Sequence, residues 1–200
     1  MPKIFFIGFN KTATFALHIF FKKHGYISYH NKAVRKNNRI LALTIHQNFL
    51  DKKWLLDGID DANVYSDLHF SNYKQVVEAN KYFKYLDLQY PGSYFILQTR
   101  NIYDWIESRL NHPKLAERHM SALGLTSLID LEEYWLKENY DTTKNILNYF
   151  ENKEKFLVYN IDNDNISTLC NFLSKDYKLD NANWKRINVT GQYFIDEFNL

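Results

Sequence analysis

Apolar and polar positions alternate along the chain in blocks that predict strands and helices in turn. Short, continuous apolar runs are typical of strands buried on both faces, and they occupy residues 3–7, 26–29, 63–66, 93–99 and 156–160. Apolar residues at three- and four-residue spacing are typical of amphipathic helices, and they occupy residues 12–24, 76–86, 102–110, 131–150 and 166–173. The alternating order predicts an α/β fold, a three-layer sandwich with helices on both faces of a central parallel sheet.

Three stretches fit this alternation less clearly. Residues 38–50 have mixed helical character, and the tail from residue 181 carries no clear pattern. Residues 112–127 are the least regular and could form a lid or a substrate loop. No repeat or Pro/Gly/Ser-rich linker divides the chain, so residues 1–200 are expected to form one domain.

Composition excludes several broad classes of protein. Hydrophobic residues make up 46% and charged residues 24% of the chain, which are ordinary globular values. A net charge of +2 is too small for a general nucleic-acid binder. The one cysteine, Cys170, shares a helical stripe with Ile166 and Leu169 and is expected to be a buried core thiol. No apolar run near the start is long enough for a signal peptide or a membrane span, which predicts a cytoplasmic protein with no membrane partner.

The first predicted strand leads into a segment with the parts of an anion site. Ligands of open α/β sheets bind beyond the carboxyl ends of the strands. Gly8 would let the backbone turn tightly there, and the N–H groups at the start of the next helix would attract an anion. Lys11 adds a positive charge, and Thr12 and Thr14 add hydroxyl donors. The segment predicts a phosphate-binding loop, with an N-capped helix and a solvated lysine as the alternative.

Two features distinguish this loop from that of a metal-dependent nucleotidase. The G-x-x-x-x-G-K-[ST] motif has a glycine directly before its lysine, where Asn10 stands here. The strand at residues 93–99 is followed by Arg100, whereas such enzymes use an aspartate at a strand end to hold Mg²⁺. A Mg-ATP-dependent small-molecule or nucleoside kinase is therefore the second hypothesis.

Residues 6–14 resemble the first loop of the sulfotransferase family, which binds the 5′-phosphosulfate end of 3′-phosphoadenosine 5′-phosphosulfate (PAPS). Ala13 stands where a glycine is common in that family. The resemblance implies a P-loop-NTPase-like fold of the sulfotransferase branch. It also implies a set of nucleotide-binding residues in the loop, namely Gly8, Asn10, Lys11, Thr12, Ala13 and Thr14.

Residues 94–108 carry a second resemblance to sulfotransferases. In that family a strand ends in an arginine and a serine follows on the next helix, and both side chains hold the 3′-phosphate. Arg100 and Ser108 occupy these positions. An arginine at a strand end offers a planar fork that matches phosphate oxygens. Trp105, between them, is interpreted as a core residue.

The chemistry implied is transfer of a sulfuryl group from PAPS to a hydroxyl of a small-molecule or glycan acceptor, with 3′-phosphoadenosine 5′-phosphate (PAP) as product. Transfer in line through a loose transition state depends mainly on positioning and electrostatics. Lys11 would neutralise the leaving oxygen, and no metal is expected. For the general base, the family position points to Asp67 first and His69 second, with His30 and His46 as further candidates.

Two further readings stay open from the sequence alone. A non-catalytic phosphoadenosine-binding module would keep Arg100 and Ser108 but would not depend on a base, and a hydrolase of such nucleotides would need a metal cluster. Near the end, Lys185 and Arg186 could close over the nucleotide or lie on a solvated surface. A basic cluster suits either an anionic acceptor or a solvated loop, and its members are Lys32, Arg35, Lys36 and Arg39.

Overall fold

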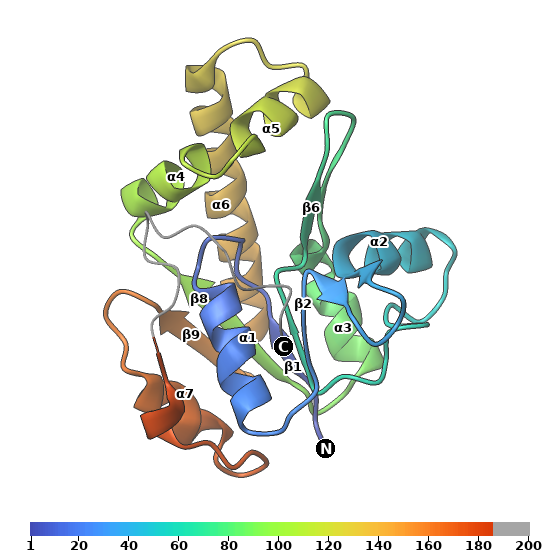
Figure 1. Ribbon diagram of the computed structural model, residues 1–200, viewed down its shortest axis with the longest axis vertical. Coiled ribbons are helices and arrows are strands. Elements are labelled where there is room, and N and C mark those ends of the chain that lie inside the picture. The colour runs from blue at the N-terminus through green and yellow to red at the C-terminus, as the bar shows by residue number, and fades with distance from the viewer. Residues whose placement is uncertain (186–200) are drawn as a thin grey trace.

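The computed structural model describes residues 1–185, which are built around a twisted sheet with helices on both faces (Figure 1). The sheet has the order β4-β3-β2-β5-β1-β8-β9. The five strands from β2 to β9 in this order pair in parallel: β2 (Ser28–His30), β5 (Val64–Ser66), β1 (Ile4–Phe6), β8 (Tyr94–Thr99) and β9 (Phe156–Asn160). Two short antiparallel strands extend the β2 edge, β3 (Lys32–Ala33) and β4 (Arg39–Ile40). The predicted central parallel sheet is confirmed.

Alternate residues of β1 supply the two cores that make this a three-layer fold. Ile4 and Phe6 pack with α1 (Thr14–Lys23) and α7 (Ile166–Leu173) on one face. Phe5 and Ile7 join the opposite core. That core is covered by α2 (Leu41–Leu50), the short 3-10 helix η1 (Ala79–Tyr82), α3 (Phe83–Gln89) and the second half of α6 (Leu128–Phe150). Because strand side chains alternate between faces, continuous apolar runs are required in strands covered on both sides.

A third core lies beyond the carboxyl edge of the sheet, where α4 (Ile102–Leu110), α5 (Leu115–Leu123) and the start of α6 meet (Figure 1). It contains Phe9, Trp105 and Trp135. A two-stranded hairpin of β6 (His69–Ser71) and β7 (Val76–Glu78) stands opposite α5. These elements enclose the side of the molecule on which the predicted phosphate loop lies.

Two predictions about local structure were wrong. Residues 76–86 do not form one helix, because Val76–Glu78 is β7 and pairs with β6 before η1 and α3 begin. Val77 lies opposite Phe70, a pairing of β-branched and aromatic side chains that favours a strand. Residues 112–127 are not irregular but contain α5, bounded by left-handed Lys114 and Gly124.

Other local expectations are confirmed. The helix expected at residues 102–110 is α4, and Cys170 is 8% exposed in the core under α7. The mixed segment 38–50 resolves into β4 followed by α2. Among the helices of residues 1–185, none is long and apolar enough to cross a membrane.

Candidate active site

The loop between β1 and α1 has the shape of an anion cradle at the carboxyl edge of the sheet. Lys11 and Ala13 both have left-handed backbone, with φ of 67° and 59°. Left-handed residues within a turn direct successive N–H groups toward a common point, where an anion can bind. Neither residue is glycine, so each left-handed conformation costs roughly 1–2 kcal/mol that surrounding contacts must offset.

Gly8 is needed for a reason other than a tight turn. Its φ is not positive, and the turn is made by later residues of the loop. A Cβ atom at Gly8 would lie only 2.4 Å from the Gln98 carbonyl oxygen on β8. The Gly8 N–H also donates to Gln98 Oε1 at 2.8 Å. The missing side chain therefore lets the loop lie directly against β8.

The two loop hydroxyls already have partners within the protein. Thr12 is 3% exposed, and its hydroxyl donates to the Phe9 carbonyl at 2.6 Å. Thr14 Oγ1 lies 3.1 Å from His30 Nε2. The strongest remaining donors toward a bound anion are therefore the backbone N–H groups of the loop and the Lys11 ammonium.

Lys11 shares its surroundings with charged residues from two other strand ends. Burial lowers its pKa below the ordinary value, the Asp67 carboxylate raises it, and the Arg100 guanidinium lowers it again. Such mutual effects require the three charges to lie near one another. Lys11 follows β1, Asp67 follows β5 and Arg100 follows β8, so the sheet order brings the three together.

Asp67 has one buried side-chain oxygen without a hydrogen-bond partner in the described residues. Its backbone is left-handed, with φ of 53°, directly after the end of β5. Asp67 Oδ2 lies 3.7 Å from His30 Nε2, whereas the buried Oδ1 has no hydrogen-bond partner within residues 1–185. His30 thus stands between Thr14 and Asp67, a grouping that the sequence did not predict.

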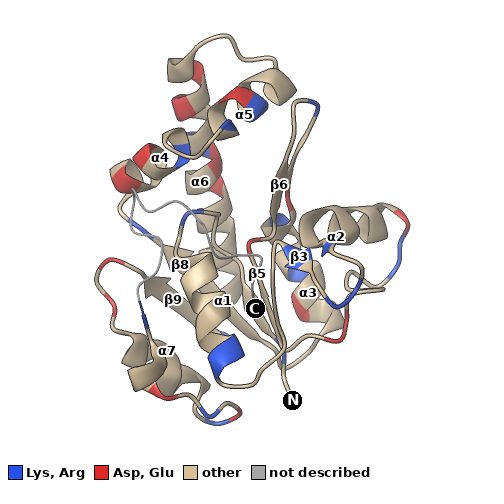
Figure 2. Ribbon diagram, viewed as in Figure 1, with Lys and Arg blue, Asp and Glu red and all other residues tan. Residues whose placement is uncertain are grey.

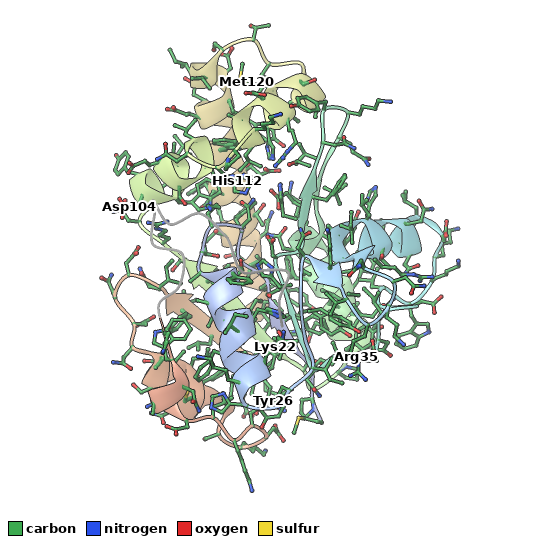
Figure 3. The ribbon with its side chains drawn as sticks, viewed as in Figure 1. Lys22, Tyr26, Arg35, Asp104, His112 and Met120 are labelled. Carbon is green, nitrogen blue, oxygen red and sulfur yellow. The ribbon has the colours of Figure 1, made fainter. Side chains whose placement is uncertain are left out.

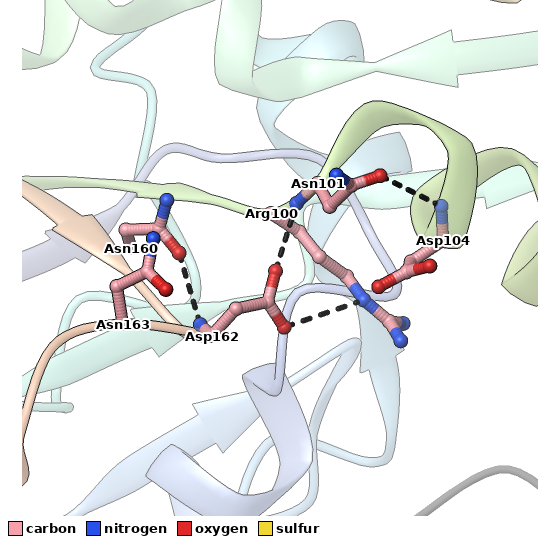
Figure 4. A pocket seen from close by; sticks show the side chains of 6 residues that line it. All are labelled: Arg100, Asn101, Asp104, Asn160, Asp162 and Asn163. Atoms are coloured by element: carbon pink, nitrogen blue, oxygen red, sulfur yellow. Dashed lines mark hydrogen bonds and ion pairs between the residues drawn. The ribbon is translucent and has the colours of Figure 1, made fainter.

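Arg100 lines a cavity of about 420 Å³ between the ends of β8 and β9 (Figure 4). Its Nε lies 3.9 Å from Asp162 Oδ1 and has no hydrogen-bond partner in the described part of the chain. Asp162 also accepts from the Asn101 N–H at 2.8 Å. The Asn101 side chain caps α4 by accepting from the Tyr103 and Asp104 N–H groups. The guanidinium is therefore held at the start of the helix that carries Ser108, which is 8% exposed.

Comparison with known proteins identifies the family. The sulfotransferase domain family matches residues 3–135, which include the phosphate loop, Asp67, Arg100 and Ser108. The chain belongs to this family. Membership of this family supports the conclusion that the chain is a transferase of sulfuryl groups. No curated protein sequence matches the chain.

Two solved structures are similar to this sulfotransferase domain. The sulfotransferase domain from the curacin biosynthetic pathway is 14% identical, with a TM-score of 0.54 over 89% of this chain and 76% of its own. A sulfotransferase from Alicyclobacillus acidocaldarius is 15% identical, with a TM-score of 0.46 over 91% of this chain and 85% of its own. The first of these supports the sulfotransferase fold.

His69 lies in a buried network rather than at the phosphate loop of the sulfotransferase domain. It is 6% exposed on β6, and its Nδ1 lies 3.0 Å from Glu78 Oε1. Its Nε2 lies 3.3 Å from Ser71 Oγ and 3.5 Å from His119 Nε2. Both ring nitrogens face protein groups, so a base role for His69 would require it to leave these partners. His46 also has a protein partner, since its Nδ1 lies 2.6 Å from Tyr82 OH.

Sequence reasoning missed His112, which lies two residues after the end of α4. Burial and Lys11 lower its pKa, whereas Asp67 raises it, so the ring lies within electrostatic reach of the site. Figure 3 shows His112 at the turn between α4 and α5, above the phosphate loop in that view. Its Nδ1 donates to the Pro113 carbonyl at 3.2 Å, which leaves Nε2 as an acceptor. No motif marks His112, because it enters the site only through the packing of α4 and α5.

The outlying basic residues have different surroundings. Lys32 and Arg39 belong to β3 and β4, at the edge of the sheet farthest from β9 (Figure 2). A second cavity, of about 620 Å³, has Ala13 and Trp184 in its lining, and exposed Lys185 is the residue after Trp184. Arg186 lies outside the described residues.

Proposed function

We propose that this sulfotransferase takes a sulfuryl group from PAPS and transfers it in line to a hydroxyl of a small-molecule or glycan acceptor, releasing PAP. The observation that carries the proposal is the meeting of Lys11, Arg100 and Asp67 at three neighbouring strand ends. Two cations suit the phosphates of a doubly phosphorylated nucleotide, and the carboxylate beside Lys11 suits a hydroxyl acceptor.

The residues present fit such a nucleotide. The 5′-phosphate would lie in the loop, where Gly8, Asn10, Lys11, Thr12, Ala13 and Thr14 surround the N–H groups. Arg100 and Ser108 would hold the 3′-phosphate. Two buried donors, Arg100 Nε and Gln98 Nε2, have no hydrogen-bond partner within residues 1–185. Because buried donors are rarely left unpaired, a bound anion would explain both.

The proposed chemistry assigns one task to each side chain. Asp67 Oδ1 accepts the proton of the acceptor hydroxyl as the new O–S bond forms. The Lys11 ammonium stabilises the negative charge that develops on the phosphate oxygen as the old S–O bond breaks. His30 keeps Asp67 and Thr14 in position. His69 stays a second candidate for the base, subject to leaving its buried partners.

We also propose that residues 1–200 act as one domain. Three residues of one short segment enter the three cores: Phe6 packs with α1 and α7, Ile7 with the opposite face, and Phe9 with Trp105. Separate unfolding of any one core would disturb the segment that carries the loop.

Thermal unfolding without divalent metal tests the donor, with PAP, ADP and AMP compared as ligands. A ligand at about 100 times its Kd stabilises a fold by about 2.7 kcal/mol, which for this size corresponds to roughly 5–10 °C. We expect that shift with PAP, a much smaller shift with ADP, and loss of the PAP shift in Arg100→Ala. An equal shift with ADP that grows with Mg²⁺ would favour the kinase instead. PAP binding without transfer from PAPS to any acceptor would favour the binding module.

A further inference from the structure

Trp105, which the sequence analysis interpreted as a core residue, also forms a hydrogen bond to the phosphate loop. It is 1% exposed, and its indole Nε1 donates to the Asn10 carbonyl oxygen at 2.9 Å. Asn10 lies in the phosphate loop, 95 positions earlier in the chain. A helix that carries the proposed 3′-phosphate ligand Ser108 is thus bonded to the loop proposed to bind the 5′ end.

That bond controls the peptide unit next to Lys11. The Asn10 carbonyl and the Lys11 N–H belong to one rigid plane, so fixing the oxygen also fixes the direction of the N–H. Lys11 is left-handed and would relax to a commoner conformation if the plane were free to rotate. Asn10 is 9% exposed, so loss of the indole N–H would leave its carbonyl buried and short of a partner.

Trp105 is itself held in place on both sides. Its ring lies 5.5 Å from the Phe9 ring and 4.6 Å from the Arg109 guanidinium. Arg109 is fully buried, pairs with Glu78 at 3.3 Å, and lies 4.6 Å from a second indole, Trp135. The donor that holds Asn10 is therefore immobilised by the third core.

We infer that Trp105 is a positioning residue for the phosphate loop, acting through the Asn10 carbonyl on the conformation of Lys11. The inference rests on the proposed function, because Lys11 and its loop are the groups proposed to bind the 5′ end of the nucleotide. It assigns to a core tryptophan a role in nucleotide affinity that core packing alone would not produce.

Trp135 provides a matched control. It is also fully buried, and its ring lies at the same 4.6 Å from Arg109. Its indole N–H donates to His119 Nδ1 at 3.0 Å and not to the loop. Trp105→Phe and Trp135→Phe therefore each remove one buried indole hydrogen bond beside the same guanidinium, but only the first removes a bond to the loop.

The experiment compares these two variants of the full chain by calorimetric titration with PAP, thermal unfolding, and hydrogen exchange of peptides covering residues 7–14. We expect both variants to lose thermal stability, but only Trp105→Phe to bind PAP about tenfold more weakly. Only Trp105→Phe should speed amide exchange in the loop. Equal PAP affinity in Trp105→Phe and the unchanged protein, or an equal loss in both variants, would overturn the inference.

Two arrangements keep the test decisive. If Trp105→Phe does not fold, β-(3-benzothienyl)alanine at position 105 or 135 replaces only the indole N–H by sulfur, with the same expected contrast. If the unchanged protein does not bind PAP, the donor assignment fails. The exchange rates in the unliganded chain would then still show whether Trp105 holds the loop.

Discussion

At the scale of single residues, the site depends on unusual backbone and on close approach. Lys11, Ala13 and Asp67 are left-handed without being glycine, and all three lie at the carboxyl edge of the sheet. Such strained residues persist only where their surroundings determine them, and they often mark functional sites. Gly8 complements them, because it alone allows the loop to touch β8.

Replacement of Gly8 by alanine should disturb the loop through contact with the Gln98 carbonyl. We expect Gly8→Ala to lose about 1–3 kcal/mol of unfolding free energy and to bind PAP at least about tenfold more weakly. Urea unfolding and PAP titration measure the two effects. Gly25→Ala is the control, since Gly25 has φ of 80° and open space around it. It should lose roughly 1–2 kcal/mol but keep its PAP affinity; unchanged PAP binding in Gly8→Ala would contradict the argument.

Asp67→Asn should separate binding from chemistry. The amide keeps the size of the side chain but cannot accept a proton, so we expect transfer to slow by about 10²–10⁴-fold. PAP affinity should stay within about threefold of the unchanged protein. The transfer rate is measured as the release of PAP from PAPS in the presence of a panel of phenols and sugars as acceptors. A full rate would show that Asp67 is not the base, and a parallel loss of PAP binding would contradict a role confined to chemistry.

At the scale of elements, a buried network joins the β6–β7 hairpin to α4, α5 and α6. Glu78 on β7 accepts from Arg109 on α4 and lies 3.0 Å from His69 Nδ1 on β6. His69 in turn meets His119 on α5, which accepts from Trp135 on α6. Burial would raise the pKa of Glu78, but His69 and Arg109 outweigh it and lower the pKa to about 2. The network therefore joins the hairpin to the three helices of the third core.

Glu78→Gln should be strongly destabilising because it leaves the fully buried Arg109 without its carboxylate. Removing one partner of a buried ion pair typically costs about 3–5 kcal/mol. Asp141→Asn is the control, since Asp141 pairs with Lys137 at 2.6 Å on the exposed face of α6. An exposed pair of this kind is worth at most about 1 kcal/mol. Comparable losses in the two variants by urea unfolding would contradict a structural role for the network.

At the scale of the whole molecule, one buried and one half-buried histidine make stability depend on pH. Burial is the main reason that the pKa of His119 falls to about 3, and the Arg109 charge and His69 add to it. Burial likewise lowers the pKa of His18 to about 3, with His30 and Lys22 contributing. Both groups take up protons more readily in the unfolded chain than in the folded protein.

Acidification should therefore begin to destabilise the fold at pH values well above those at which carboxylates titrate. A histidine with a depressed folded pKa favours unfolding as pH falls below about 6.5, and the effect grows until about pH 3. Glu78 affects stability at lower pH. Its stabilising contribution is fully present above about pH 4.5 and is lost as the pH falls toward 2. We expect the free energy of unfolding to fall by up to about 1.4 kcal/mol per pH unit for fully buried His119 between pH 6 and 5. His119→Asn should flatten the dependence of Tm on pH, and a Tm unchanged between pH 7 and 5 would refute the assignment.

Local patterns along the chain were enough to predict the sheet, most of its helices and the loop. The apolar run before Gly8, the strand before Arg100 and the stripe of α4 each reflect burial within one element, which periodicity records directly. The resemblance to sulfotransferases predicted that Lys11 and Arg100 serve one nucleotide, and parallel strands bring their carboxyl ends to one edge.

Only the tertiary structure decided which distant side chains touch. The β6–β7 hairpin escaped prediction because Val76–Glu78 gains its partners from another strand, and α5 because its buried face is defined by α6 and the hairpin. His112 and the bond from Trp105 to Asn10 likewise arise from the packing of α4 above the loop. By itself, the sequence determined the elements and the chemical groups they carry, since each follows from local burial and residue type. The arrangement of the site was decided by contacts between residues as far as 95 positions apart in the chain, which a local sequence pattern cannot predict.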